Sequence, residues 1–532
     1  MLKTLLAFEK VPQLAKTDIA YATSDPKLKP FYVHEPAVTS FEAVIAARAP
    51  FQTPRAALVQ VLKEQYHKIP AEALVNQHIE QLLAPDTYTV TTAHQPALFL
   101  GPLYFVYKAI TTITLAEAAS KETGKTVIPV FVLGSEDHDL EELNHISLFN
   151  KALTWEPNES GAVGSMRTDQ VRPLLVQLKD ILGSADFAVE IFAHLEQAYT
   201  QADDFASATQ ALLHALFGRF GLLVLNMNHP VLKREFIPLM RQELLEQTSQ
   251  SLVSATADAL NAAGFKTQAS PRAINLFYLD KGLRERIVLE DGIYKALNTN
   301  LVWSEAEILD LLEKHPEHFS PNVVLRPLFQ ELVLPNLAYV GGGGELAYWL
   351  ERKTQFETLG IPYPMLVRRN SVLWLDKDAQ KKLQKFGFTA SEFFEDTDHL
   401  VRRFVETNAS GEINLQPEIQ AIAQVYEQLA AKAAAIDPTL DKAVRADASK
   451  TTAALEQWQA RLMKAEKQRH EVTLNQLRAL KEKLFPGNGL QERSENFLAY
   501  YLKYGPGYFD TLKAALQPFD PGFIILSEEI PY

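Results

Sequence analysis

The feature of this sequence that most constrains its fold is an apolar run at residues 126–133, TVIPVFVL, followed after one glycine by the polar cluster SEDHD. Short unbroken apolar runs are typical of strands buried on both faces, as in a parallel sheet covered by helices. A β-rich run, TYTVTT, lies at residues 87–92, and the segment from Gly101 to about Ser120 predicts a helix between them. This order predicts a right-handed βαβ unit. We also expect a second helix after residue 134, with Ser135 as its N-cap.

Further along the chain, the same kinds of segment recur with an insertion between them. Residues 221–226, GLLVLN, predict another buried strand, and the strand-like segment before residue 341 ends in four glycines. Shorter and more polar β segments at 274–296 predict an inserted lobe, which we place at roughly residues 150–320. Residues 1–415 are therefore expected to form one α/β core with insertions.

The C-terminal part of the chain has a different character. Glycine is absent from residues 416–485, and apolar residues recur there at helical spacing on both sides of an Asp437-Pro438 break. This pattern predicts two long helices in an antiparallel coiled-coil arm. Residues 486–532 are aromatic and interrupted by Gly and Pro, so we expect them to pack back on the core.

The composition of the chain disfavours some classes of binding partner and of functional site. The formal net charge of -13 disfavours nonspecific binding to nucleic acid or to anionic membranes. The absence of cysteine excludes disulfides, thiolate metal sites and a cysteine nucleophile in this chain. No apolar run approaches the roughly 18 residues of a membrane span, and the N-terminus lacks the pattern of a signal peptide. We therefore expect a cytoplasmic location, without a membrane or nucleic-acid partner.

The first group of candidate functional residues follows the strand at 87–92. A polar turn at the carboxyl end of a parallel strand lies where such sheets bind ligands. Gly101 permits close backbone approach, and the N-terminus of the next helix offers free N–H groups to an anion. The alternative is an ordinary β-α turn with packed aromatic residues. The group comprises His94, Gln95, Gly101, Tyr104 and Lys108.

The second group follows the strand at 126–133. Carboxylates beside a histidine suit general acid–base catalysis or recognition of an ammonium group. A metal site is not expected, because adjacent side chains do not share a helix face. The alternative is a solvated helix cap. The group comprises Glu136, Asp137, His138 and Asp139, with Asn144 and His145 close by in the sequence.

The third group surrounds the glycine run at residues 341–344. Such a run between a strand and a helix can bind a phosphate or carboxylate through backbone N–H groups, although a flexible hinge is the alternative. The run has neither the GxGxxG nor the GxxxxGK[ST] pattern, so neither a dinucleotide fingerprint nor a P-loop is predicted. The group comprises Arg326, Gln330, Gly342, Gly343, Glu345 and Tyr348.

Taken together, these segments resemble the bacillithiol biosynthesis cysteine-adding enzymes, a family of cysteine ligases. The matching motifs run in order along the chain: Gly-Pro-Leu-Tyr with Tyr-Lys at 101–108, Pro-Val-Phe with Glu-Asp-His-Asp at 129–139, Pro-Arg with Asn-Leu-Phe-Tyr at 271–278, Arg-Pro with Gln-Glu at 326–331, and Gly-Gly-x-Gly-Glu-x-Ala-Tyr-Trp at 341–349. One departure is Ala93-His94, where the family pattern has Gly-Gln. His94 therefore changes the polarity of this turn, whereas Gln95 matches the family pattern.

The resemblance implies a Rossmann-like core with connecting insertions and a coiled coil that forms a homodimer. It also implies the last step of bacillithiol synthesis, which joins the carboxyl group of cysteine to the amine of glucosaminyl-malate. ATP or another nucleotide could activate that carboxyl group, but no residue pattern here fixes the donor. Two alternatives stay open: a related nucleotide-dependent enzyme with another small-molecule substrate, and a non-enzymatic coiled-coil assembly protein.

Amide formation assigns roles to these residues. A base must remove a proton from the amine, and the tetrahedral oxyanion needs donors such as Lys108 or the 341–344 amides. Arg272, Arg326 and the Arg368-Arg369 pair can bind the carboxylates of malate. The candidate catalytic residues are His138, Glu136, Asp137, Asp139 and Lys108. The candidate substrate-binding residues are His94, Gln95, Gly101, Tyr104, Asn144, His145, Arg272, Arg326, Gln330, Gly342, Gly343, Glu345 and Tyr348. The first two groups are expected to line one cleft.

Overall fold

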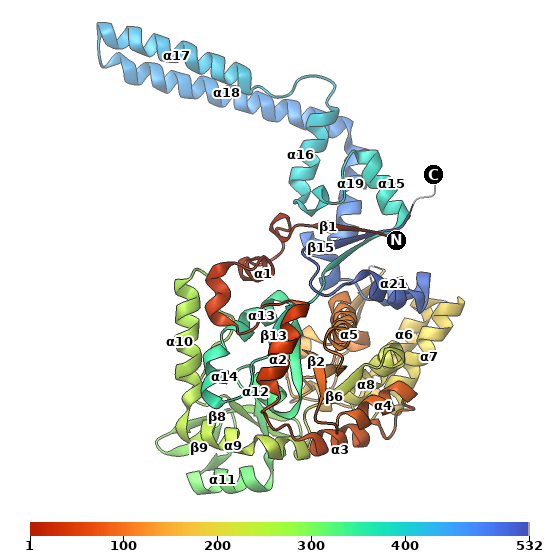
Figure 1. The fold of residues 1–532 in the computed structure, drawn as a ribbon. Coiled ribbons are helices and arrows are strands. Elements are labelled where there is room, and N and C mark those ends of the chain that lie inside the picture. Colours follow the sequence, from red (N-terminus) through yellow and green to blue (C-terminus); the bar gives the residue numbers. More distant parts are fainter. Residues whose placement is uncertain (150, 530–532) are drawn as a thin grey trace. The chain divides into compact units, whose positions relative to one another are not determined.

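The structure is a computed structural model that describes residues 1–149 and 151–529, and the chain divides into two compact units (Figure 1). The first unit consists mainly of residues 3–373 and 492–524, and the second mainly of residues 374–491. The C-terminal segment therefore returns to the first unit after the chain has formed the second. Strands β1 (Leu2–Leu6), β14 (Val372–Leu375) and β15 (Phe523–Ser527) each contain residues of both units.

A parallel five-stranded sheet forms the centre of the first unit, as the sequence predicts. Its strand order is β13-β12-β2-β3-β6, and every neighbouring pair is parallel. The two strands predicted at 87–92 and 126–133 pair along their whole length, from Thr87 opposite Thr126 to His94 opposite Leu133. The strands are β2 (Thr87–His94), β3 (Thr126–Leu133), β6 (Leu223–Asn226), β12 (Asn336–Gly341) and β13 (Met365–Arg368).

Helices cover both faces of this sheet, so its strands are buried on both sides. Phe41 of α2 (Phe41–Arg48) and Leu115 of α5 (Leu103–Thr123) share one apolar cluster with β2, β12 and β13. The other face contributes to a larger cluster with α3 (Arg55–Tyr66), α9 (Pro230–Glu246), α12 (Arg326–Val333) and α13 (Gly343–Leu350). This two-sided burial explains the unbroken apolar runs of β2 and β3.

The helix predicted after β3 does not form, and this expectation is wrong. The chain instead makes a short 3-10 turn, η5 (Leu140–Glu142), and continues into β4 (His145–Leu148), which pairs with β5 (Lys151–Thr154). Ser135 does not cap a helix, because its hydroxyl donates to the Asn226 side chain at 2.6 Å. The Ser135 hydroxyl, which would have capped the helix, thus bonds to a residue distant in the sequence instead.

The polar β segments predicted near residue 280 form a second, antiparallel sheet in the order β10-β9-β8-β7-β11. Its strands are β7 (Leu276–Asp280), β8 (Leu283–Glu290), β9 (Ile293–Ala296), β10 (Val302–Trp303) and β11 (Phe319–Pro321). Between β5 and β7 the chain is largely helical, with α6 (Arg172–Leu182), α7 (Asp186–Gln201), α8 (Phe205–Phe217) and α10 (Thr248–Ala262) besides α9. Arg284 of β8 and Pro321 of β11 line the candidate site.

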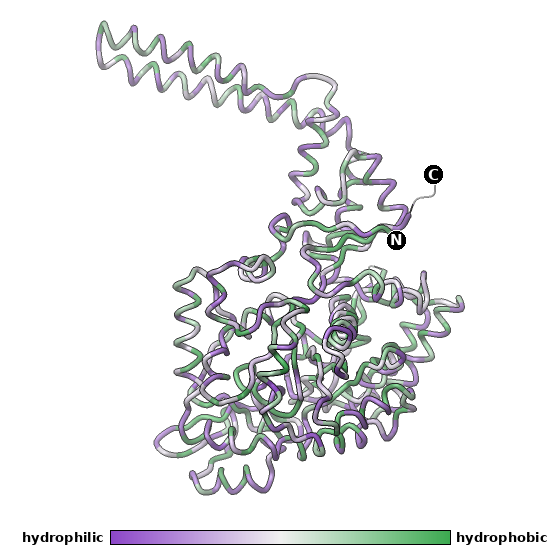
Figure 2. The backbone as a smooth tube through the Cα atoms, in the orientation of Figure 1, coloured by the Kyte–Doolittle hydropathy of each residue, from purple (hydrophilic) through white to green (hydrophobic). Residues whose placement is uncertain are grey.

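The second unit contains the predicted helical hairpin. Helices α17 (Gln416–Ile436) and α18 (Leu440–Arg469) pack along each other, and the Asp437 side chain accepts the Thr439 N–H at 2.8 Å in the turn between them. Figure 2 shows hydrophobic and hydrophilic residues alternating along both helices. The unit also contains α15 (Lys377–Phe386), α16 (Thr397–Asn408) and α19 (Glu471–Leu484).

The last part of the first unit is helical. Helix α20 (Leu498–Tyr504) contacts α7, and α21 (Gly507–Ala515) contacts α5. Phe509 lies edge-on to Phe217 with ring centroids 4.9 Å apart.

Among the described residues, no helix is long and apolar enough to cross a membrane.

Candidate functional site

A cavity of about 580 Å³ opens at the carboxyl ends of the central strands. The parallel register brings the ends of β2, β3, β12 and β13 to one edge of the sheet, so the turns that follow them meet there. Part of each of the three sequence groups lines this cavity. The predicted residues among the lining are His94, Gln95, Tyr104, Glu136, Asp137, Arg326, Gly342, Glu345 and Tyr348.

His94 is held as a neutral acceptor beside Tyr104. Its Nδ1 lies 2.9 Å from the carbonyl oxygen of Gln95 and must carry the proton, so Nε2 accepts from the Tyr104 hydroxyl at 3.2 Å. Burial lowers the pKa of His94 to about 4, and the nearby Lys108 ammonium also lowers it. At neutral pH this residue is therefore a hydrogen-bonding group and too weak a base to take a proton.

The low pKa of His94 predicts a pH-dependent contribution to stability. In the unfolded chain this histidine protonates near pH 6.5, and in the folded chain only near pH 4, so the unfolded state binds more protons in that window. Stability should therefore fall as the pH drops from 6.5 to 4, by about 1.4 kcal/mol for each tenfold difference in proton affinity. Urea unfolding of the wild type and His94→Gln across this range measures the effect, and parallel curves for the two proteins would contradict it.

Lys108 and Glu345 form an ion pair beneath the cavity. The Lys108 ammonium, whose side chain is 1% exposed, lies 2.8 Å from Glu345 Oε1 and donates to the Ala93 carbonyl at 2.5 Å. Burial would raise the pKa of Glu345, but Lys108 and the Gly342 and Tyr339 hydrogen bonds outweigh it and hold the pKa below its usual value. Lys108 does not line the cavity, so it supports Glu345 and is not placed to contact substrate.

The glycine run is less open to an anion than the sequence suggests. The Gly342 N–H already donates to Glu345 Oε2 at 2.9 Å. A Cβ atom at Gly343 would lie 2.2 Å from Cγ of Asp18, whose carboxylate pairs with Arg368. Two carboxylates therefore occupy this side of the run, and the glycines serve close packing as much as any ligand.

Asp137 is the catalytic candidate with the most defined position in the cavity wall. Its Oδ2 accepts from the Gln95 side chain at 3.1 Å, and its Oδ1 lies 3.7 Å from the Arg284 guanidinium. Burial would raise the pKa of Asp137, but Arg284 and the hydrogen bonds from Gln95 and the His138 backbone lower it overall. Asp137 is therefore ionised at neutral pH.

His138 lies outside the cavity lining, contrary to the expected cleft residues. Arg284 donates to His138 Nδ1 at 2.7 Å, so the imidazole lone pair is occupied and Nε2 carries the proton. That arrangement disfavours His138 as the base. Asp139, the residue before η5, and Gly101 also lie outside the lining, and the Gly101 carbonyl accepts from Asn496 at 2.6 Å.

Other predicted residues do not line the cavity themselves. Gln330 is fully buried and accepts from Arg326 at 3.1 Å, and Arg326 also donates to the Tyr348 hydroxyl at 3.0 Å. Asn144 donates to the Trp155 carbonyl at 3.0 Å. The exposed Arg272 and His145 do not contribute to the lining.

Sequence reasoning missed several charged residues of the cavity. These are Glu142, Arg284 and Arg493. Arg369, one of the arginines expected to bind malate, also lines the cavity, where it pairs with the buried Glu492 at 2.7 Å. Arg284 lies in β8, and Arg493 lies in the C-terminal segment, far from any of the three motifs. Among Glu142, Arg284 and Arg493, only Glu142 had a local signal, because it closely follows the SEDHD cluster.

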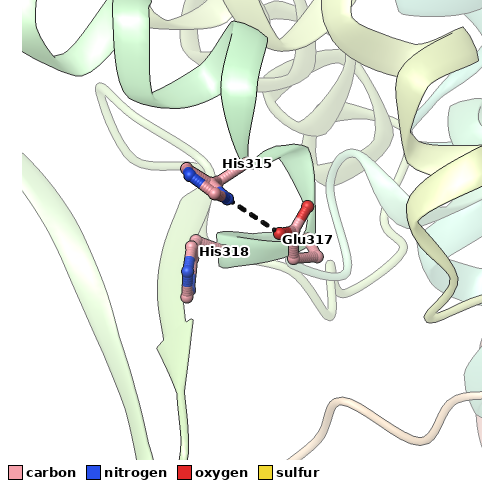
Figure 3. Close-up of side chains that lie close together, drawn as sticks. All are labelled: His315, Glu317 and His318. Carbon is pink, nitrogen blue, oxygen red and sulfur yellow. Dashed lines mark hydrogen bonds and ion pairs between the residues drawn. The ribbon is translucent and has the colours of Figure 1, made fainter.

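Glu136 connects the cavity to the only potential metal-binding cluster found among the described residues. The buried Lys233 ammonium donates both to Glu136 and to the backbone carbonyl of Glu317. Figure 3 shows the side chain of Glu317 beside His315 and His318, with His315 Nδ1 3.1 Å from Glu317 Oε1. Ligand atoms of these three residues lie within 4.8 Å of one another.

Comparison with known proteins gives matches over nearly the whole chain. Residues 2–370 match the family model described as "Bacillithiol biosynthesis BshC, N-terminal Rossmann-like domain", and residues 372–528 match its C-terminal coiled-coil domain. Curated relatives include proteins of Flavobacterium johnsoniae (38% identity; 95% of this chain and 96% of the relative), Flavobacterium psychrophilum (35%; 98% and 98%) and Christiangramia forsetii (34%; 95% and 96%). Each bears the name "Putative cysteine ligase BshC".

Proposed function

The chain belongs to the bacillithiol biosynthesis BshC family, and on that premise we propose that it is a cysteine ligase that catalyses the last step of bacillithiol synthesis. The bond formed is an amide between the carboxyl group of cysteine and the amine of glucosaminyl-malate. The observation that carries the proposal is the cavity itself, which presents an ionised carboxylate, Asp137, and a half-buried guanidinium, Arg326, on walls built from the family motifs.

Asp137 is the residue best placed to take the proton from the attacking amine. Once the nitrogen has attacked the carbonyl carbon it carries a positive charge and becomes strongly acidic, so even a carboxylate of low pKa can accept its proton. The Gln95 amide at 3.1 Å fixes the orientation of the carboxylate. Arg284 offsets its charge, which limits how strongly Asp137 stabilises the unreactive ammonium form.

Arg326 is suited to a carboxylate of the malate group. Its hydrogen-bond partners, Gln330 and Tyr348, are neutral, so its charge is not cancelled by a direct ion pair. Burial would lower the pKa of Arg326, but Tyr348, Tyr339 and Glu345 raise it above its usual value. A guanidinium held in this way offers paired N–H donors to a carboxylate.

Condensing a carboxylate with an amine releases water, so the carboxyl group must be activated by another reactant. We propose ATP or another nucleoside triphosphate for this role. The test is to incubate the purified chain with cysteine and glucosaminyl-malate, with and without each nucleotide, and to measure the amide by mass spectrometry. Cells that lack this protein should accumulate glucosaminyl-malate and lose bacillithiol, and unchanged bacillithiol in such cells would reject the function.

We also propose that residues 416–485 mediate a homodimer. Large apolar side chains on the hairpin are solvent-exposed in the single chain: Val425 by 63%, Leu429 by 48%, Ile436 by 84% and Trp458 by 55%. Exposed apolar patches of this kind are typical of association surfaces.

The hairpin residues give a direct test of the dimer. Leu429→Glu should shift the protein to monomers in sedimentation velocity at micromolar concentration, because it buries a charge in the proposed interface. Ala431→Glu adds the same charge two residues along the helix, on the opposite face, and should leave the dimer intact. A wild-type protein that sediments as a monomer would contradict the proposal.

A further inference from the structure

The charged groups that line the cavity are mostly neutralised by partners within the first unit. A lining charge that already has an ion-pair partner attracts a charged ligand less strongly, because the partner balances it. Arg326 has neutral hydrogen-bond partners and is assigned above to malate. The pairs are Glu136 with Lys233, Asp137 with Arg284, Glu345 with Lys108, and Arg369 with Glu492.

Two lining charges are left over, one of each sign. The side chains of Glu142 and Arg493 are exposed, and among residues 1–149 and 151–529 they have neither an ion-pair nor a hydrogen-bond partner. They are not paired with each other either. A cavity with one unbalanced carboxylate and one unbalanced guanidinium is complementary to a ligand that carries both an ammonium and a carboxylate.

Both charges affect the pKa of one residue that lines the cavity, Tyr104. Burial raises the pKa of Tyr104, Arg369 lowers it and Glu345 raises it, and among the smaller causes Arg493 lowers it while Glu142 raises it. Glu142, Arg493 and Tyr104 all line the same cavity.

The backbone fixes this arrangement, because both residues are anchored to the same loop. Leu143, next to Glu142, accepts the Leu98 N–H at 2.8 Å through its carbonyl. Asn496, three residues after Arg493, donates to the carbonyls of Phe99 at 3.0 Å and Gly101 at 2.6 Å.

The loop between these anchors is itself unusual. Phe99, Leu100 and Gly101 all have positive φ, at 46°, 61° and 55°. Such a conformation is unfavourable for the two non-glycine residues, and the surrounding hydrogen bonds hold it in place. On the other side of Arg493, Glu492 is held by Arg369 and by the Val372 N–H at 3.1 Å.

We propose that Glu142 and Arg493 bind the α-ammonium and α-carboxylate of the amino-acid substrate. This inference rests on the proposed function and names the subsite for cysteine. Glu142 is unpaired, so it stabilises an ammonium strongly, which suits the amine that must not react. Holding the α-amine protonated prevents cysteine from attacking a second activated cysteine.

The test uses Glu142→Gln and Arg493→Gln in the full chain. Each substitution removes one charge-assisted hydrogen bond, and the loss of about 1.5–3 kcal/mol should raise the KM for cysteine by about 10- to 150-fold. The KM for glucosaminyl-malate should stay within about threefold, since hydrogen bonds to that substrate are untouched. Glu141→Gln changes the neighbouring exposed carboxylate, which does not line the cavity, and should leave both KM values unchanged.

Calorimetric binding with truncated ligands separates the two roles without requiring turnover. Cysteamine lacks the carboxylate, so Arg493→Gln should weaken cysteine binding but leave cysteamine binding unchanged. 3-Mercaptopropionate lacks the ammonium, so Glu142→Gln should weaken cysteine binding but leave 3-mercaptopropionate binding unchanged.

The outcomes distinguish this subsite from the ligase function. Unaltered cysteine affinity in both variants, or a rise confined to the KM for glucosaminyl-malate, overturns the subsite while the ligase function stands. If the wild type forms no amide yet binds cysteine through this pair, the function fails and the subsite holds. If the wild type does not bind cysteine at all, both fail.

Discussion

Replacing Asp137 with Asn is expected to lower the rate of the chemical step by about 10²- to 10⁴-fold, the usual range for a positioned base. The amide of Asn can still accept the hydrogen bond that the His138 backbone N–H donates to Asp137 at 2.8 Å, so the turn should keep its shape. What the variant loses is the negative charge and the ability to accept a proton. The measurement is single-turnover amide formation, because slow product release would otherwise mask the loss.

His138→Gln is the matched control, because it changes the adjacent residue of the same turn. The Gln carbonyl can accept from Arg284 as the imidazole Nδ1 does at 2.7 Å, whereas the titratable ring is lost. Because the lone pair of His138 is already occupied, the rate should change by no more than about threefold, well below the effect of losing a base. If His138→Gln lost as much activity as Asp137→Asn, His138 would be the base and the role of Asp137 would be to orient it.

Glu345→Gln is expected to destabilise the first unit by about 3–5 kcal/mol, the cost of removing one partner of a buried ion pair. The ammonium of Lys108, 1% exposed, would lose the carboxylate that it pairs with among the described residues and keep the Ala93 carbonyl. The Gln side chain can still accept from the Gly342 N–H, so the start of α13 should persist. Urea unfolding, followed by a probe in the first unit, measures the loss of free energy.

An exposed ion pair provides the control for this experiment. Lys68 and Asp203 lie 2.6 Å apart with side chains 71% and 79% exposed, so Asp203→Asn should leave the free energy of unfolding nearly unchanged. Combining Lys108→Met with Glu345→Gln removes the buried charge as well and should recover part of the lost stability. A single Glu345→Gln variant as stable as Asp203→Asn would show that Lys108 finds another partner or loses its proton.

The sequence by itself determined the central architecture and the family. The apolar runs at β2 and β3, with a helix between them, specify a parallel sheet because the period of hydrophobic residues is a local property of the chain. The glycine-free helical pattern around Asp437-Pro438 specified the hairpin for the same reason. The motifs also placed Gln95 and Asp137 at one sheet edge, since consecutive parallel strands end there.

The tertiary structure alone decided which of these residues can act. Lys108 and Glu345 are 237 positions apart, and only the fold shows that they neutralise each other beneath the cavity. The helix expected after β3 does not form, because Ser135 and Asp137 bond to Asn226 and Gln95. Glu142 and Arg493 become a pair of free charges only because the C-terminal segment returns to the loop at Gly101. Local patterns specify strands and helices, but the state of a charge depends on distances between residues far apart in the sequence.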